Sequence, residues 1–452
     1  MRAMLTATRA IPMLVAGALA ASPVVARDWV PTASAGARID GVWRSRGYGH
    51  ILTIARGVPR VYHVAGTQCY RDPSPDAGKD ESYRLVSVTN RDRIAFTVAP
   101  GTTDYAFDRI GALPAACATP RDWSRQAIAD VVAATFADLY PGFGPRGRTV
   151  PELTAALTDA GKSPTDAALY ARLTTALGRL DDAHVGLEAS IDGEDRSFEG
   201  GEAPTILAAR ADPRLGDDPA MREKRWSTAY RQGILDLLGD SAQTVANRRI
   251  LWGRIGRIGY INIVAMGAFD PDAGPDDTTA LDTALDGAIA AFRDLPGVIV
   301  DVTNNRGGYD SISLHIAGRF ADRTRPAFIK RPAGVAGADQ RFAVTPSPRP
   351  RYTGPVALLT SDITVSAGET FTLAMRALPT VRHMGATTRG ALSDQLAKPL
   401  PNGWTLTLPA ERYRDPAGQS QEGIGITPAE PIPAFAPDHT AMIVEAARRL
   451  NQ

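Results

Sequence analysis

Lysine is scarce in this chain of 452 residues: five lysines stand among 50 basic residues. Few positions can therefore supply a lysine general base. The net charge is also small, at +1, so the chain has no electrostatic footprint for nucleic acid. No apolar run is long enough to cross a bilayer, which argues against a membrane-spanning helix.

Only two cysteines are present, Cys69 and Cys117. In an oxidising compartment, an isolated pair forms a disulfide more often than a metal or redox site. The alternative is a pair of buried thiols. A disulfide closing a loop of this size would stabilise the fold by roughly 4 kcal/mol.

Residues 1–26 have the pattern of a signal peptide. Arg2 and Arg9 form the basic start, residues 11–21 are apolar, and small residues end the segment at Ala26. The apolar stretch is too short to span a bilayer. We therefore expect an exported protein, periplasmic or extracellular. Removing this segment takes away two arginines and no acid, so the formal charge falls from +1 to −1.

The remaining chain is long enough for more than one domain. Short apolar stretches over residues 38–118, separated by glycine, proline, asparagine and aspartate, predict a small antiparallel sheet or barrel. We assign it to an all-β N-terminal domain of residues 27–120. Helical periodicity then predicts a helical subdomain over residues 121–190. Residues 191–250 are predicted to be a connector or insertion.

Residues 251–452 alternate between predicted strands and helices, which indicates an α/β core with a sheet covered by helices. The predicted strands span residues 258–263, 297–303, 356–360 and 381–384. The predicted helices span residues 278–295, 309–320 and 370–378.

Ser366 lies between the predicted strand 356–360 and the predicted helix 370–378. A hydroxyl at such a junction can be exposed, with the free amides of the first helical turn pointing at the group it attacks. Ser366 and Glu369 also fit a capping box, in which the hydroxyl accepts a hydrogen bond from the Glu369 amide. The motif alone leaves both interpretations open.

His184 follows a predicted helix, beside Asp181 and Asp182. Such a histidine is either a structural residue or a base at the rim of a site. His315 and His383 are alternative bases in a helix and a strand, where histidines are usually structural. His439, near the C-terminus, is expected at the surface.

Five separated segments carry a resemblance to one family: residues 180–185, 301–308, 366–369, 385–390 and 422–428. In order, they are similar to Leu-x-Asp-Gly-His-Thr, Asp-Leu-Arg-Gly-Asn-x-Gly-Gly, Ser-Ala-x-Glu, Gly-x-x-Thr-x-Gly and Glu-Gly-x-Gly-x-x-Pro. Through them the chain resembles the carboxy-terminal processing and tricorn-core serine peptidases. The resemblance implies a ClpP/crotonase-like catalytic domain.

The same resemblance implies the roles of individual residues. Ser366 corresponds to the nucleophile, His184 to the general base and Glu422 to the carboxylate that orients the imidazole. The oxyanion hole corresponds to the amide of Ala367 and a glycine amide from Gly307 and Gly308. The substrate is expected to be a peptide or protein, with no cofactor and no metal.

Departures from the family pattern indicate which branch of the family the chain resembles, the one with a lysine base or the one with a histidine base. Ala391 stands where the tail-specific branch has its lysine base, and Lys398, further on, is expected to be a surface charge. No PDZ domain is evident in residues 188–250. Both departures favour the histidine-base branch, which includes the tricorn proteases. Ala183 stands where tricorn proteases have the serine of their tetrad, and Asp181 or Asp182 could partly substitute for it.

The sequence therefore predicts an exported serine peptidase that works through an acyl-enzyme. Two other functions fit the same fold: a non-catalytic binding protein for apolar ligands, and an esterase-like acyl hydrolase.

Overall fold

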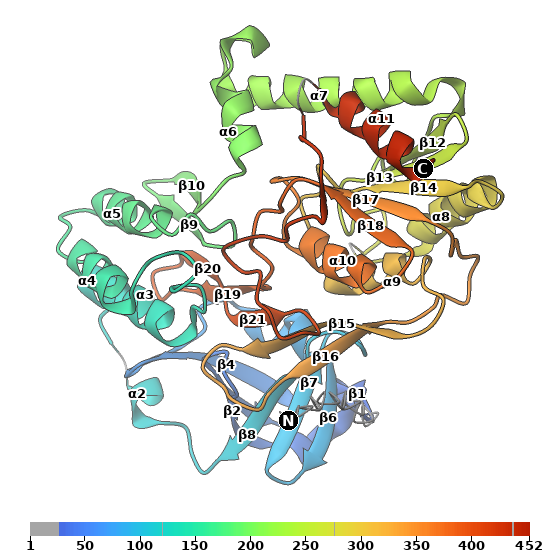
Figure 1. Ribbon diagram of the computed structural model, residues 1–452. Coiled ribbons are helices and arrows are strands. Elements are labelled where there is room, and N and C mark those ends of the chain that lie inside the picture. Colours follow the sequence, from blue (N-terminus) through green and yellow to red (C-terminus); the bar gives the residue numbers. More distant parts are fainter. Residues whose placement is uncertain (1–26, 120, 275, 436–437) are drawn as a thin grey trace, which may run out of the picture.

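The computed structural model describes residues 27–119, 121–274, 276–435 and 438–452. The predicted signal peptide, residues 1–26, lies outside the described residues. Figure 1 shows an N-terminal sheet, a group of helices beside it, and a core sheet covered by helices.

The N-terminal part is an antiparallel eight-stranded sheet with strand order β1-β6-β7-β8-β2-β3-β4-β5. Its strands are β1 (Val30–Pro31), β2 (Gly41–Ser45), β3 (His50–Ala55), β4 (Val58–Ala65), β5 (Gln68–Arg71), β6 (Leu85–Asn90), β7 (Arg93–Thr97) and β8 (Tyr105–Ile110). Trp43, Phe96 and Phe107 are buried in its core. The prediction of a small all-β domain is confirmed.

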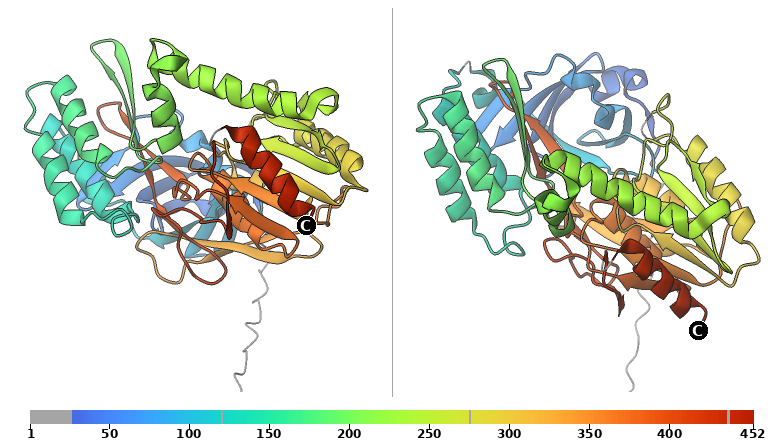
Figure 2. Two further views of the ribbon diagram at one scale, coloured as in Figure 1. Left: turned by 45° about the horizontal axis from the view of Figure 1, so that its top comes forward. Right: turned by 90° about the horizontal axis from the view of Figure 1, so that it is seen from above.

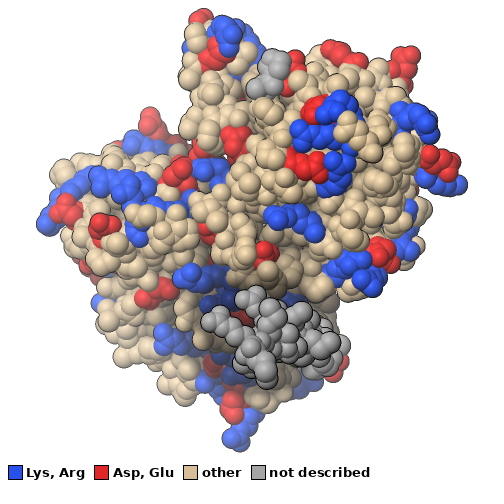
Figure 3. Space-filling view, in the orientation of Figure 1, with Lys and Arg blue, Asp and Glu red and all other residues tan. Residues whose placement is uncertain are grey.

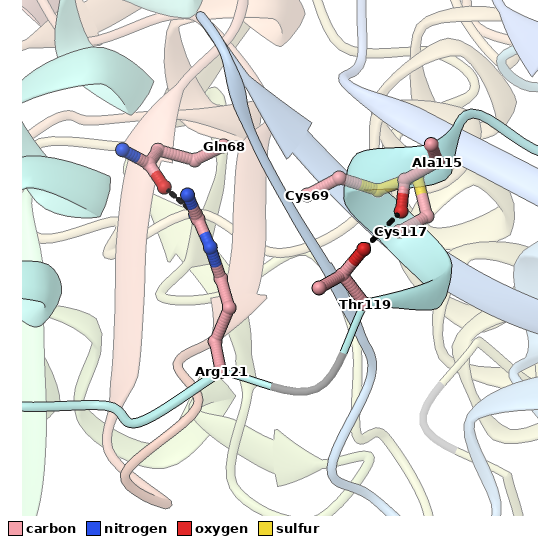
Figure 4. Close-up of a disulfide and its surroundings, with 6 residues drawn as sticks. All are labelled: Gln68, Cys69, Ala115, Cys117, Thr119 and Arg121. Atoms are coloured by element: carbon pink, nitrogen blue, oxygen red, sulfur yellow. Dashed lines mark hydrogen bonds between the residues drawn. A yellow bond between two sulfur atoms is a disulfide. The ribbon is translucent and has the colours of Figure 1, made fainter.

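A disulfide joins Cys69 on β5 to Cys117 on the short helix α2 (Ala115–Ala118), with the two Cα atoms 4.6 Å apart (Figure 4). The sulfurs pack with buried Ile51. The predicted disulfide is therefore confirmed, and it ties the sheet to the chain that leads into the helical part.

The helical part contains α3 (Arg125–Leu139), α4 (Val150–Ala160) and α5 (Asp166–Gly178). Ser124, Thr149 and Thr165 cap their N-termini, which explains where each helix begins. The helices share a hydrophobic core with a four-stranded sheet of order β10-β9-β20-β19. Its strands are β9 (Gly186–Ile191), β10 (Glu194–Glu199), β19 (Gln395–Pro399) and β20 (Thr405–Pro409).

The core is a seven-stranded sheet with order β11-β12-β13-β14-β17-β18-β22. Its strands are β11 (Gln243–Val245), β12 (Ile250–Ile255), β13 (Ile258–Ile263), β14 (Gly297–Asp301), β17 (Val356–Thr360), β18 (Val381–Gly385) and β22 (Glu430–Pro431). The strands from β13 to β22 are parallel, and the first pairings at the β11 edge are antiparallel.

Helices cover both faces of this sheet (Figures 1 and 2). Ile299 packs in the cluster that includes α7 and α11, whereas Val298 and Val300 pack in the cluster that includes α8, α9 and α10. This alternation follows from the period of two along a strand. These covering helices are α7 (Pro219–Leu238), α8 (Thr279–Phe292), α9 (Asp310–Ala317), α10 (Ala367–Arg376) and α11 (His439–Leu450), whereas α6 (Pro204–Ala211) packs beside α7. The prediction of a ClpP/crotonase-like core with a helical subdomain is confirmed.

A small three-stranded sheet of order β16-β15-β21 lies between the core helices and the N-terminal domain (Figure 1). Its strands are β15 (Arg325–Pro332), β16 (Gln340–Val344) and β21 (Glu411–Arg414). The Gln340 side chain donates a hydrogen bond to the Asp104 carbonyl, which joins this sheet to the N-terminal domain.

Lys398 on β19 is buried, so the expectation of a surface charge is wrong. Its Nζ donates to the carbonyls of Tyr48, at 2.6 Å, and Gly49, at 3.0 Å. Lys398 therefore links the four-stranded sheet to the N-terminal domain.

Charges of both signs are interspersed over the face of the molecule shown in Figure 3. Among the helices of the described ranges, none is both long and apolar enough to cross a membrane.

Candidate active site

Ser366 occupies a sharp turn between β17 and α10, at the carboxyl edge of the parallel strands. Its backbone has φ 58° and ψ −125°, a conformation that costs free energy for a residue with a side chain. Its hydroxyl makes no capping hydrogen bond, so the capping-box interpretation is wrong. The Glu369 amide donates instead to the Ser366 carbonyl, at 2.8 Å.

Gly307 packs directly against Ser366. Its φ is 86°, and a Cβ atom at this position would lie 2.6 Å from the Ser366 Cβ and 3.2 Å from its Oγ. Glycine is therefore required here, both by the backbone conformation and by the close approach of the nucleophile.

Two of the three predicted oxyanion donors remain free. The Gly307 amide donates to Asn305 Oδ1, at 2.9 Å, and is occupied. The amides of Gly308 and Ala367 donate to no carbonyl within the described part of the chain. Gly308 and Ser366 line the same cavity, so these two amides are the available donors beside the hydroxyl.

Residues 391–393 connect the three predicted catalytic residues. The Ser366 amide donates to the Ala391 carbonyl, at 2.9 Å. Glu422 Oε2 accepts from the amides of Leu392 and Ser393, each at 3.1 Å. The Ser393 backbone also acts on His184, whose pKa it raises against the lowering by burial.

No hydrogen bond joins Ser366 Oγ, the His184 ring and Glu422 among the described residues. Glu422 Oε1 and His184 Nδ1 are both buried and have no hydrogen-bond partner in that part of the chain. The segment 391–393 thus contacts both Ser366 and Glu422, and the described residues do not form the hydrogen bonds of a closed triad.

Burial lowers the pKa of His184, because it disfavours the charged imidazolium. The negative charge of Asp182 opposes this shift, and the positive charge of Arg146 adds to it. A neutral imidazole at neutral pH is the form that a general base requires.

Asp182, one of the two suggested substitutes for the tetrad serine, is fully buried. Its Oδ1 accepts from the His184 amide, at 3.0 Å, and its Oδ2 accepts from the Tyr140 hydroxyl, at 2.8 Å. Asp181 is exposed and pairs with Arg389 instead. Asp182 therefore holds the backbone of the histidine, whereas Asp181 does not.

Arg146 is a residue of this site that sequence reasoning missed. Its guanidinium lies 2.9 Å from Asp182 Oδ2 and 3.6 Å from Glu422 Oε1, and its side chain is 5% exposed. It also donates to the carbonyls of Asp181, at 2.6 Å, and Gly390, at 3.0 Å. No motif marks this arginine, because its partners lie far away in the sequence.

Glu422 is held in a buried and strongly charged environment. Burial raises its pKa to about 8, and the charges of Asp182 and Glu369 add to the increase. Arg146 acts in the opposite direction and favours the carboxylate.

Glu369 fixes the loop that supports Ser366. Its Oε1 accepts from the Thr388 hydroxyl, at 2.6 Å, and the Gly390 amide, at 2.8 Å. Its Oε2 accepts from the Ala391 amide, at 2.8 Å. The glutamate that suggested a capping box thus positions the residue whose carbonyl binds the Ser366 amide.

The alternative bases have other partners. His383 Nε2 lies 2.8 Å from the Thr360 hydroxyl, and burial lowers its pKa to about 3. His315 lines the cavity of Ser366, but its Nε2 is 2.8 Å from Asp282. Neither ring is hydrogen-bonded to Ser366 within the described part of the chain.

His439 is buried, so its expected surface position is wrong. Its Nε2 lies 2.6 Å from Asp301 Oδ2, which also accepts from the Tyr260 hydroxyl. The pair joins the first residue of α11 to the last residue of β14.

A cavity of about 510 Å³ opens beside Ser366. Asp310, Lys330 and Asp394 line it, and Thr103 and Tyr105 of the N-terminal domain form part of its wall. Across the described ranges, no group of three or more His, Cys, Asp or Glu side chains is arranged to hold a metal ion.

The fold and the family comparison place the chain in the class of serine-type peptidases. Residues 257–432 match the model of peptidase family S41. The matched region contains Ser366 and Glu422, and His184 precedes it. No curated protein sequence matches the chain.

Solved structures share the fold. A protein of Parabacteroides merdae, provisionally described as a peptidase, is 22% identical, with a TM-score of 0.58 over 73% of this chain and 97% of its own. Mature CPAF is 13% identical, with a TM-score of 0.51 over 73% of this chain and 95% of its own. CPAF complexed with lactacystin is also 13% identical, with a TM-score of 0.50 over 73% of this chain and 97% of its own.

Proposed function

We propose that this serine peptidase uses Ser366 as nucleophile, His184 as general base and Glu422 as the carboxylate that orients the imidazole. The observation that carries this assignment is the turn at Ser366. It presents the hydroxyl beside the free amides of Gly308 and Ala367, and it is hydrogen-bonded to the 391–393 segment that also holds Glu422.

In the first half of the reaction, Ser366 Oγ attacks the peptide carbonyl carbon while His184 accepts the hydroxyl proton. The carbonyl oxygen becomes an oxyanion and accepts from the amides of Gly308 and Ala367. Collapse breaks the C–N bond, and His184 returns the proton to the leaving amine. Water, deprotonated by His184, then hydrolyses the acyl-enzyme and restores Ser366.

This mechanism requires the imidazole to reach Ser366 Oγ when the substrate is bound. Hydrogen bonds between catalytic groups are often long in an empty site and shorten in the complex with substrate. Two buried atoms have no hydrogen-bond partner among the described residues, His184 Nδ1 and Glu422 Oε1. They would gain partners if these hydrogen bonds shortened when substrate binds.

Labelling with a fluorophosphonate probe tests the assignment. We expect the wild type to be labelled, Ser366→Ala to lose labelling completely, and His184→Ala to lose nearly all of it. Ser190→Ala changes an exposed serine on β9 and is the matched control, which should be labelled like the wild type. Persistent labelling of well-folded Ser366→Ala would overturn the nucleophile assignment. A labelled enzyme that turns over acyl esters but no peptides would be the esterase-like alternative.

We also propose that the protein is exported, to the periplasm or the extracellular space. The pattern of residues 1–26 and the disulfide between Cys69 and Cys117 support this, because disulfides persist in oxidising compartments. Sequencing the N-terminus of the purified mature protein tests it. A chain that begins at Arg27 in an exported fraction is expected, and an uncleaved cytosolic chain would contradict it.

A further inference from the structure

A buried cluster of charges lies at the cavity beside Ser366. Lys330 on β15 is 1% exposed, and its Nζ lies 2.6 Å from Asp394, 3.4 Å from Asp310 and 3.5 Å from Glu411. Three carboxylates thus surround one ammonium group. When all four groups are ionised, the cluster has an excess of negative charge.

The hydrogen bonds show the same imbalance. An ammonium group has three donors. Lys330 Nζ directs them at Asp394, at Asp310 and at the Tyr413 hydroxyl, 2.9 Å away. Glu411 Oε2 receives none of them, and it is a buried atom without a hydrogen-bond partner in the described part of the chain. Glu411 Oε1 accepts from the Tyr48 hydroxyl, so Oε2 is the atom that lacks a donor. Burial raises the pKa of Glu411 to about 7, so above this pH, with its carboxyls ionised, the cluster lacks a positive charge as well.

The excess charge opens onto the reacting space. Asp310 and Asp394 line the same cavity as Ser366, and the Asp394 side chain is 41% exposed. Phe342 and Tyr105 form apolar parts of the wall. A long side chain with an apolar stem and a cationic end fits such a surface, because the stem packs on aromatic rings while the charge meets carboxylates.

We propose that this cavity binds a lysine or arginine side chain of the substrate, next to the scissile bond. This specificity rests on the proposed function, because it places the scissile carbonyl at Ser366. Glu81, an exposed residue of the N-terminal domain, lines the same cavity and adds to the attraction at its rim. The N-terminal domain therefore contributes to the choice of substrate.

Peptide binding to the Ser366→Ala protein tests the proposal without requiring catalysis. The probes are short randomised peptide mixtures with lysine, norleucine or glutamate at one fixed central position. Norleucine keeps the apolar stem of lysine and removes the charge. We expect the lysine mixture to bind roughly tenfold more tightly than the norleucine mixture, and the glutamate mixture to bind most weakly.

Variants of one carboxylate in the buried cluster and one at the exposed rim show which carboxylates cause the preference for lysine. In the Ser366→Ala background, Asp394→Asn should abolish most of the preference for lysine. Glu81→Gln, at the exposed rim, should reduce it about twofold without disturbing the buried cluster. Glu194→Gln on the β9–β10 hairpin is the matched control, because its side chain is exposed and outside the cavity, and it should leave the preference unchanged.

The outcomes separate this proposal from the proposed function. Equal binding of the lysine and norleucine mixtures, or no binding of the lysine mixture, overturns the specificity whatever the fluorophosphonate result. A lysine preference that stays undiminished in both Asp394→Asn and Glu81→Gln also overturns it. If the protein prefers lysine but Ser366 is never labelled by the fluorophosphonate, the proposed binding site stands and the catalytic assignment is refuted.

Discussion

Arg146 and Asp182 form a buried ion pair, with 2.9 Å between Nε and Oδ2. The arginine belongs to the loop between α3 and α4, and the aspartate to the turn that follows α5. Because Asp182 also accepts from the His184 amide, the pair links the charge of Arg146 to the position of the imidazole.

Replacing Arg146 should change the pH dependence of the enzyme. Burial lowers the pKa of His184, and Arg146 lowers it further. Arg146→Gln should therefore raise this pKa. Because the base must be neutral, the acid limb of kcat/KM should move to higher pH.

Two further variants check the sign of that shift. Arg146→Lys keeps the positive charge and should leave the acid limb close to that of the wild type. Asp182→Asn removes a charge that raises the pKa of His184, so its limb should move to lower pH. A limb that stays in place in all three variants would show that Arg146 is only structural.

The strands of the core could be predicted from the sequence because their signal is local. The apolar runs at 258–263 and 356–360 coincide with β13 and β17. The candidate residues of the active site could also be predicted from the sequence, because they lie in short motifs with fixed spacing. The role of the Ser366 hydroxyl could not be predicted from the local sequence. A capping box and a sharp turn that presents a nucleophile can have the same sequence pattern.

Buried charges were not predictable, because their partners are distant in the sequence. Lys398 resembles a surface lysine, yet it donates to the carbonyl of Tyr48, 350 residues away. Lys330 pairs with Asp394, 64 residues away, and Arg146 donates to Gly390, 244 residues away. Burial of these side chains depends on how the domains pack against one another. The periodicity of the sequence carries no information about that packing.

Gly307→Ala should abolish activity, because the new Cβ would lie 2.6 Å from the Ser366 Cβ. Gly403→Ala separates this contact from backbone strain. Gly403 has φ 85°, almost the same as the 86° of Gly307, but a Cβ there would meet nothing within 4 Å. In urea unfolding, Gly403→Ala should lose stability of the order of 1 kcal/mol through backbone strain alone, and Gly307→Ala should lose more because its Cβ also clashes. Only Gly307→Ala should lose fluorophosphonate labelling, and equal labelling of the two would contradict the close packing.

Glu369→Gln should lower both stability and activity. A glutamine amide group cannot accept from the backbone amides of Gly390 and Ala391 with both of its polar atoms, so at least one buried donor loses its acceptor. The expected loss is about 1–3 kcal/mol in the free energy of unfolding, with a lower kcat because Ala391 binds the Ser366 amide. Glu430→Gln, which removes a partly exposed ion pair with Arg382, should cost less than 1 kcal/mol and leave kcat unchanged.

Lys398→Met should change how stability depends on pH. Burial lowers the pKa of Lys398 well below its ordinary value of 10.5. Between the lowered pKa and 10.5, the unfolded chain binds more protons than the folded protein, so this lysine makes stability rise with pH. In Lys398→Met this contribution is absent, and the carbonyls of Tyr48 and Gly49 lose a donor.

The difference in unfolding free energy between wild type and Lys398→Met should therefore grow with pH, by at most about 1.4 kcal/mol per unit. Urea unfolding at several pH values between about 7 and 10 measures it. Lys162→Met is the matched control, because the side chain of Lys162 is 74% exposed and its difference from wild type should stay constant. If the two differences run parallel, Lys398 is protonated in the folded protein, and the contact between β19 and the N-terminal domain contains a buried positive charge.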